Sequence, residues 1–130
     1  GSKVIRKSEK DLFTVVGAGI TLHEALKASE ELKNRGIFIR VIDLYSIKPL
    51  DVETLKNALS ETKAIITVED HYPAGGIGEA VKSEVGSERI YSLACTKTPK
   101  SGTPEELLDY EGVSSKALVN KIFELKDKFF

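Results

Sequence analysis

Hydrophobic and polar positions along this chain follow two different periods. Short apolar runs rich in β-branched residues predict five strands, at Lys3–Arg6, Leu12–Val16, Phe38–Leu44, Ala64–Val68 and Arg89–Cys95. After the second strand, apolar residues between the runs recur every three or four positions, which is the period of an amphipathic helix. Strands that alternate with helical segments predict right-handed βαβ units and a mostly parallel sheet.

Local capping signals predict where the helices begin. Helix starts are expected at Thr21, Asp51, Gly76, Thr103 and Ser115. Thr21 and Glu24 have the spacing of a capping box, in which each side chain would accept the backbone N–H of the other residue. Asp51 is a favourable N-cap for the second helix, and Gly36 is placed to end the first.

The polar link from Ser8 to Asp11 predicts a hairpin that sets the first strand antiparallel to the second. The chain is therefore expected to form a single three-layer α/β/α domain with a five-stranded, mostly parallel sheet and one antiparallel strand. Its 130 residues are enough for one such domain and too few for two ordinary ones. The sequence contains no methionine, and Gly1-Ser2 resembles the remnant of a purification tag. We therefore expect an excised domain at residues 3–130, preceded by a tag remnant at residues 1–2.

Charge and cysteine content narrow the classes of partner. The 19 basic and 20 acidic residues give a formal net charge of −1, so no overall field favours binding to nucleic acid or to an acidic membrane. The chain also lacks an apolar run long enough to span a bilayer. The single cysteine, Cys95, excludes an internal disulfide and indicates a reducing compartment, so we expect a cytoplasmic protein. Its position in an apolar strand indicates a buried, inert thiol.

A first candidate site is the turn Gly17–Gly19. Together with Asp43 at the end of the next strand, it resembles a dinucleotide-binding turn. Leu22 replaces the third glycine of that motif, however, and the predicted capping box at Thr21–Glu24 would occupy the amides that a pyrophosphate needs. The residues favour a structural turn over a nucleotide site, and His23 is expected to be solvated on the polar side of the helix.

A second candidate site follows the strand at Ala64–Val68, at the edge where α/β sheets bind their ligands. It contains three ionisable residues and three glycines, which are Glu69, Asp70, His71, Gly75, Gly76 and Gly78. The glycine amides could hold an anion, but the carboxylates would repel it. Two carboxylates and an imidazole could bind a metal ion, but adjacent residues of an extended chain point to opposite faces and cannot all converge. Proton transfer by His71 stays open. The residues favour a structural or interface loop, so no catalytic, cofactor-binding or metal-binding residue is assigned.

Several motifs along the chain resemble one enzyme family. They are Val16–Gly19 with Leu22–Ala25, Ser46–Asp51, Val68–Val81, Thr98–Gly102 and Pro104–Leu108. In this order they resemble the C-terminal domain of transketolase, a thiamine-diphosphate-dependent enzyme. The related 1-deoxyxylulose-5-phosphate synthases and the β subunits of 2-oxo acid dehydrogenases share part of the pattern. The triplet Glu69–His71 fits transketolase better than either relative.

The resemblance implies a domain that helps to build a homodimer, next to the other transketolase domains or a separate subunit. Its parent would transfer a two-carbon ketol unit from a ketose phosphate to an aldose phosphate in the pentose phosphate pathway. Thiamine diphosphate and Mg²⁺ would be bound by the preceding domains, and this chain contains no Gly-Asp-Gly cofactor motif. The isolated domain is thus expected to bind no cofactor and to be inactive. An independent regulatory domain that binds a nucleotide or a sugar phosphate stays open as an alternative.

Overall fold

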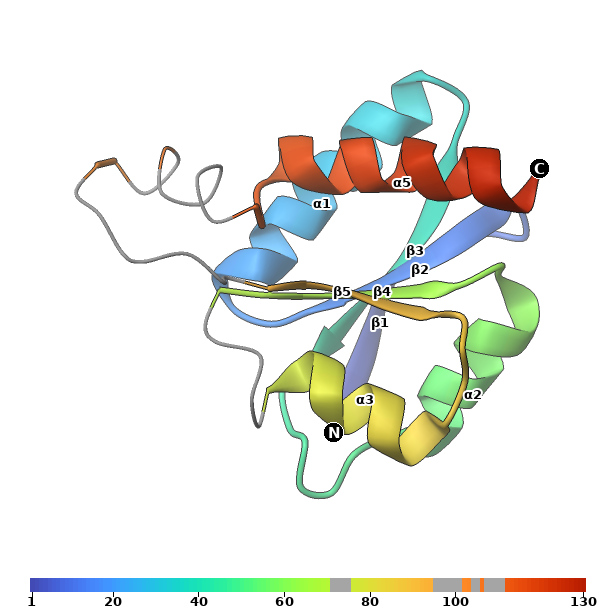
Figure 1. Ribbon diagram of the computed structural model, residues 1–130, viewed down its shortest axis with the longest axis vertical. Coiled ribbons are helices and arrows are strands. Elements are labelled where there is room, and N and C mark those ends of the chain that lie inside the picture. The colour runs from blue at the N-terminus through green and yellow to red at the C-terminus, as the bar shows by residue number, and fades with distance from the viewer. Residues whose placement is uncertain (71–75, 95–101, 104–105, 107–111) are drawn as a thin grey trace.

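The computed structural model describes residues 1–70, 76–94, 102–103, 106 and 112–130. The elements in chain order are β1 Ser2–Arg6, β2 Asp11–Gly17, α1 Ile20–Asn34, β3 Phe38–Leu44, α2 Val52–Glu61, β4 Ile65–Glu69, α3 Ile77–Val85, β5 Ile90–Ala94 and α5 Ser115–Phe129. Helices α1 and α5 cover one face of the sheet, and α2 and α3 cover the other (Figure 1). This arrangement confirms the predicted three-layer α/β/α class. None of the helices in the described ranges has the length and apolar character needed to cross a membrane.

The strand order is β1-β3-β2-β4-β5, with β1 antiparallel to β3 and the other neighbours parallel. The mixed sheet with one antiparallel strand was predicted, but the hairpin between the first two strands is wrong because β3 lies between them. The physical reason is burial. Strand β3 is apolar apart from Arg40 and Asp43 and needs neighbours on both sides, whereas β1 carries Lys3 and Arg6, which suit an exposed edge.

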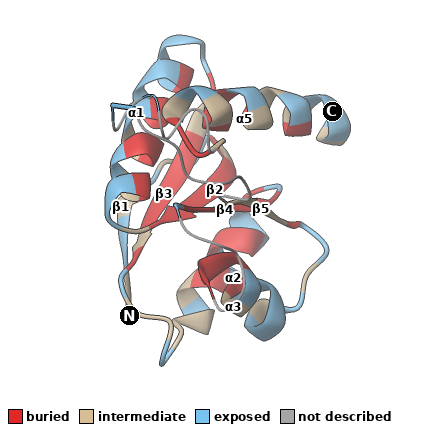
Figure 2. Ribbon diagram, turned by 60° about the vertical axis from the view of Figure 1, so that its left-hand side comes forward, coloured by how far each residue is buried: buried red, intermediate tan, exposed pale blue. Residues whose placement is uncertain are grey.

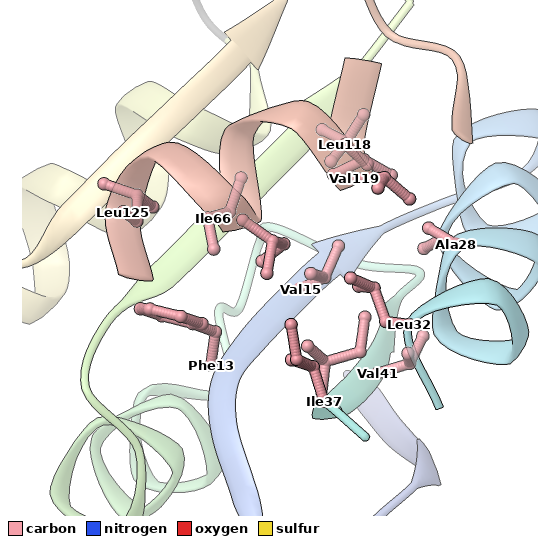
Figure 3. Close-up of a cluster of buried hydrophobic side chains, with 14 of the residues drawn as sticks. Phe13, Val15, Ala28, Leu32, Ile37, Val41, Ile66, Leu118, Val119 and Leu125 are labelled. Carbon is pink, nitrogen blue, oxygen red and sulfur yellow. The ribbon is translucent and has the colours of Figure 1, made fainter. Parts of the chain in front are cut away.

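Two hydrophobic clusters lie on opposite faces of the sheet. Burial is concentrated in the strands and in the inner faces of the helices (Figure 2). On the α1–α5 face, Leu118, Val119 and Leu125 of α5 gather with side chains of the sheet and of α1 (Figure 3). The ring of Phe129 extends this cluster by an edge contact with Phe13, at 6.2 Å between ring centroids. A fully buried leucine side chain contributes roughly 1.5–3 kcal/mol to the stability of a fold. Leu118 and Leu125 are buried, so α5 is an integral part of the core.

Several predicted helix ends are confirmed. The Asp51 carboxylate accepts the Thr54 N–H at 3.2 Å and caps α2. Gly36 follows α1 with φ of +78°, a conformation that glycine adopts without strain. At the helix start predicted at Thr103, Thr103 and Glu106 exchange the two hydrogen bonds of a capping box, at 3.3 and 3.2 Å. The rest of the helix expected there, and the predicted buried thiol of Cys95, lie outside the described residues.

The first two residues contact the loop that joins β3 to α2. The Ser2 hydroxyl donates to Asp51 Oδ2 at 2.7 Å, and the Gly1 ammonium lies 3.4 Å from the carbonyl oxygens of Ser46 and Pro49. These contacts do not test the prediction that residues 1–2 are a tag remnant. They do show that the N-terminal residue lies beside this loop.

Candidate functional site

The predicted site lies at the carboxyl end of β4, where the chain leaves the sheet and later begins α3. Four of its six residues are described, namely Glu69, Asp70, Gly76 and Gly78. His71 and Gly75 lie outside the described residues. Among the four described residues, Glu69 and Gly78 connect the end of β4 to the start of α3.

Glu69 is 1 % exposed and caps α3 with both carboxylate oxygens. Oε1 accepts the N–H of Ile77 at 3.0 Å, and Oε2 accepts the N–H of Gly78 at 2.7 Å. The N-cap residue Gly76 has no side chain with which to bond these amides. The first amides of a helix have no partner within it, and the positive end of the helix dipole favours a negative charge. The preceding strand therefore supplies the cap that the helix itself lacks.

Gly78 lies against a small polar group formed by Glu69, Thr67 and Ser92. The two hydroxyl oxygens lie 2.9 Å apart, between neighbouring strands in which Thr67 pairs with Ser92. A Cβ on Gly78 would come within 3.0 Å of Thr67 Oγ1 and 3.1 Å of Glu69 Oε2, and would meet Ser92 Oγ most closely of all. The glycine is thus required for the close approach of α3 to the sheet. It does not offer an open amide to an anion.

Asp70 is exposed, in contrast to its neighbour Glu69. This difference in burial agrees with side chains that alternate along an extended chain. Across the described ranges, no group of three His, Cys, Asp or Glu side chains is arranged to hold a metal ion.

A second buried carboxylate, Glu24, caps α5. Its Oε1 accepts the N–H of Ser115 at 3.0 Å, and its Oε2 lies 3.3 Å from Lys27 Nζ. Ser114 adds the N-cap bond of the same helix by accepting the N–H of Ala117 at 3.1 Å. The predicted capping box of Thr21 and Glu24 is therefore wrong. The interhelix contact replaces it, because the packing of α5 on α1 brings unpaired amides to a carboxylate that is only 3 % exposed.

Hydrogen bonds to Thr21 hold the turn Gly17–Gly19. The Thr21 N–H donates to the Ala18 carbonyl at 3.3 Å. Thr21 Oγ1 accepts the Ala18 N–H at 3.1 Å and donates to the Ala18 carbonyl at 2.9 Å. A Cβ on Gly17 would lie 3.1 Å from the Leu22 nitrogen, so the glycine allows helix and strand to approach closely. The arrangement favours the structural turn over a pyrophosphate site. His23 is exposed, as predicted.

Asp51, which follows β3, is a carboxylate whose pKa is shifted in the folded chain. Hydrogen bonds from the Ser2 hydroxyl and from the hydroxyl and amide of Thr54 lower the pKa of Asp51 from its ordinary value of 3.8. Each bond stabilises the charged form. The ionised side chain holds the first strand, the following loop and α2 together.

Sequence reasoning identified Glu69 but not Thr67 and Ser92, which lie with it against Gly78. Side chains alternate along a strand, so Thr67 and Glu69 of β4 lie on one face, and this spacing can be read from the sequence. The pairing of Thr67 with Ser92 depends on strand register, which the local pattern does not specify.

Comparison with known proteins identifies relatives over nearly the whole chain. A family model described as "Transketolase, C-terminal domain" matches residues 2–118. Transketolase-like protein 1 of Bos taurus is 54% identical over 122 residues, which is 91% of this chain and 20% of that protein. Transketolase of Mus musculus is 47% identical over 131 residues, or 98% of this chain and 21% of that protein.

A solved structure described as a split gene transketolase, inactive beta4 tetramer, has a TM-score of 0.85 and 31% sequence identity. The match covers 95% of this chain and 41% of that one. The chain spans about one fifth of the length of the curated relatives it matches.

Proposed function

The chain belongs to the transketolase C-terminal domain family, and from this membership we propose that its parent protein is a transferase of the transketolase type. The parent would move a two-carbon ketol unit from a ketose phosphate to an aldose phosphate, a reaction of the pentose phosphate pathway. We assign this domain a structural and interface role within that enzyme.

One observation carries the structural role. Both oxygens of the Glu69 carboxylate, at the edge where a ligand would be expected, accept backbone amides of α3. Glu24 likewise holds α5 and lies beside Lys27. A group that must remain fixed to hold a helix is poorly suited to exchange protons or to bind a substrate. Glu69 and Glu24 therefore stabilise the fold.

Thiamine diphosphate with Mg²⁺ is the cofactor that the family implies. The described residues of the two candidate sites do not fit this group. A diphosphate requires free amides or cations, yet the Ala18 amide is bonded to Thr21 and the Gly78 amide to Glu69. The described ranges also lack a set of three metal-binding side chains. The cofactor and the chemistry would therefore belong to the rest of the parent protein.

The domain would act beside the other transketolase domains, on one chain or on a separate subunit, and would contribute to a homodimer. A solved relative described as an inactive beta4 tetramer supports oligomeric assembly. The single cysteine supports a reducing compartment, and we place the parent in the cytoplasm.

Two measurements test the proposal. Calorimetric titration of this chain with thiamine diphosphate and Mg²⁺ is expected to give no heat of binding, and the chain alone should transfer no ketol unit. The full-length parent should transfer it when supplied with the same cofactors. Micromolar binding of thiamine diphosphate by the isolated chain would overturn the structural assignment. A parent protein that binds both cofactors but transfers no ketol unit would overturn the proposed activity.

A further inference from the structure

Apolar side chains that are exposed or only partly buried lie on the loop that follows β3 and at the start of α2, where Ile47 and Leu50 also pack partly against the second hydrophobic cluster. Tyr45 is 65 % exposed, although aromatic side chains usually contribute to a core or an interface. Ile47, Pro49, Leu50 and Val52 follow it, and they line a concavity of about 430 Å³. We call these five residues the Tyr45 surface.

The rim of the Tyr45 surface is polar. Lys48 and Glu84 complete the lining of the concavity and bring one charge of each sign. An apolar centre with a charged rim is the composition of a protein interface. Independent protein partners usually bury about 20–30 residues a side, many more than the five of the Tyr45 surface.

The N-terminal residues lie beside this surface. Tyr45 Oη donates to the Ser2 carbonyl at 3.4 Å, and the Gly1 ammonium lies 3.4 Å from the Pro49 carbonyl oxygen. Figure 1 shows the N-terminus beside the loop between β3 and α2. The curated relatives are about five times as long as the matched region, and the family model describes that region as C-terminal. In a parent of that length, the preceding polypeptide would reach this domain next to Tyr45.

We propose that the Tyr45 surface is the docking face for the domain that precedes this one in the parent protein. The occupant is an apolar segment of that domain, with charges that complement Lys48 and Glu84. A short covalent connection raises the effective concentration of the two domains to the millimolar range, so a small apolar contact is enough to hold them together. The inference rests on the proposed function, because it takes the multidomain parent as given.

Side-chain footprinting by hydroxyl radicals tests the docking face directly. Tyr45 should be oxidised about tenfold more slowly in the full-length parent than in this chain alone. This is the result expected if the two domains are docked to each other most of the time. Phe130 is the internal reference because it is equally exposed, at 67 %, and lies at the end of α5. Its oxidation rate should be the same in both proteins. Equal oxidation of Tyr45 in both proteins would overturn the proposal.

A second copy of the domain is the competing occupant. If the Tyr45 oxidation rate in the isolated chain falls as protein concentration rises, self-association covers the surface and the proposal fails. Ketol transfer by the parent is measured separately. Loss of that activity with Tyr45 still protected would refute the proposed function and leave the docking face intact.

Matched variants separate docking from folding. Tyr45→Ser and Phe130→Ser remove side chains of similar exposure, so both isolated variants should keep the circular dichroism spectrum and melting midpoint of the unaltered chain. In the full-length parent, Tyr45→Ser should raise the oxidation of Ile47 and Leu50 about tenfold, towards the rate in the isolated chain. Phe130→Ser should leave that rate unchanged. An equal response to both variants would refute a docking role for Tyr45.

Discussion

The carboxylate of Glu69 offers the sharpest test of how this domain is held together. Replacing Glu69 with glutamine preserves the shape of the side chain but leaves only one acceptor oxygen. The amides of Ile77 and Gly78 each use one oxygen of the native carboxylate. In Glu69→Gln, one of them therefore faces an NH₂ group that can only donate.

The expected cost follows from these two amides. A buried donor without an acceptor costs about 1–3 kcal/mol, and loss of the negative charge at the helix N-terminus adds about 0.3–1 kcal/mol. The central value of the sum is about 2.6 kcal/mol. At about 2.1 cal/mol/K per residue, the unfolding entropy of 130 residues is about 0.27 kcal/mol/K, so the melting midpoint should fall by about 10 °C.

Thermal unfolding followed by circular dichroism measures this fall, with Glu84→Gln as the control. Glu84 is an exposed residue of the same helix, so the same chemical change there should shift the free energy of unfolding by no more than about 0.5 kcal/mol. Hydrogen exchange at the Ile77 and Gly78 amides should accelerate in Glu69→Gln alone. If the two variants melted at the same temperature, the view that Glu69 stabilises the start of α3 would be wrong.

Three further changes test other contacts. Gly78→Ala should lower the free energy of unfolding by about 1 kcal/mol, because overpacking costs about 1–3 kcal/mol while alanine regains about 1 kcal/mol of helix propensity. Denaturant titration should show that Ser92→Ala reduces this loss, and additive effects of the two changes would contradict the predicted clash. Glu24→Ala should cost about 1–3 kcal/mol by leaving the Ser115 amide unpaired, and an unchanged urea midpoint would speak against that cap. Asp51 has a lowered pKa in the folded chain, so its charge stabilises the fold above pH 3.8, and this contribution disappears as the pH falls through the folded-state pKa. The stability difference between the native chain and Asp51→Asn should therefore shrink in acid, and a difference that is constant with pH would refute the assignment.

Much of this fold could be predicted because its signals are local. Ser115 was expected to begin the last helix, and α5 does begin there. Asp51 was expected to cap α2 from its residue type and position alone, and its carboxylate accepts the Thr54 amide. Such features depend on neighbours within one helical turn, which a sequence displays directly.

The errors concern partners that are distant in sequence. Glu24 has the spacing to cap its own helix, yet it bonds to Ser115 because α5 packs against α1. The first strand was expected to pair with the second, but it pairs with β3, which follows α1 and lies between β1 and β2. Local patterns do not determine which segment occupies a neighbouring position in space.

The candidate site was predicted from a strand end that carries ionisable residues and glycines. The alternation of side chains agrees with the burial of Glu69 and the exposure of Asp70. It did not reveal that Glu69 would turn back to the amides of a helix that begins eight residues later, at Ile77. That contact needs the three-dimensional path of the chain.

The hydrogen bond between Ser115 and Glu24 spans 91 residues and joins the first helix of the domain to its last. During synthesis, nearly all of the domain must therefore leave the ribosome before the start of α5 can reach its acceptor. Until then, Ala28 and Leu32 on the inner face of α1 lack the cover that α5 provides. Contacts of this sequence separation are slow to form because a long loop must close first. The nascent domain is thus expected to present one of its two hydrophobic clusters to chaperones and proteases until the last helix emerges.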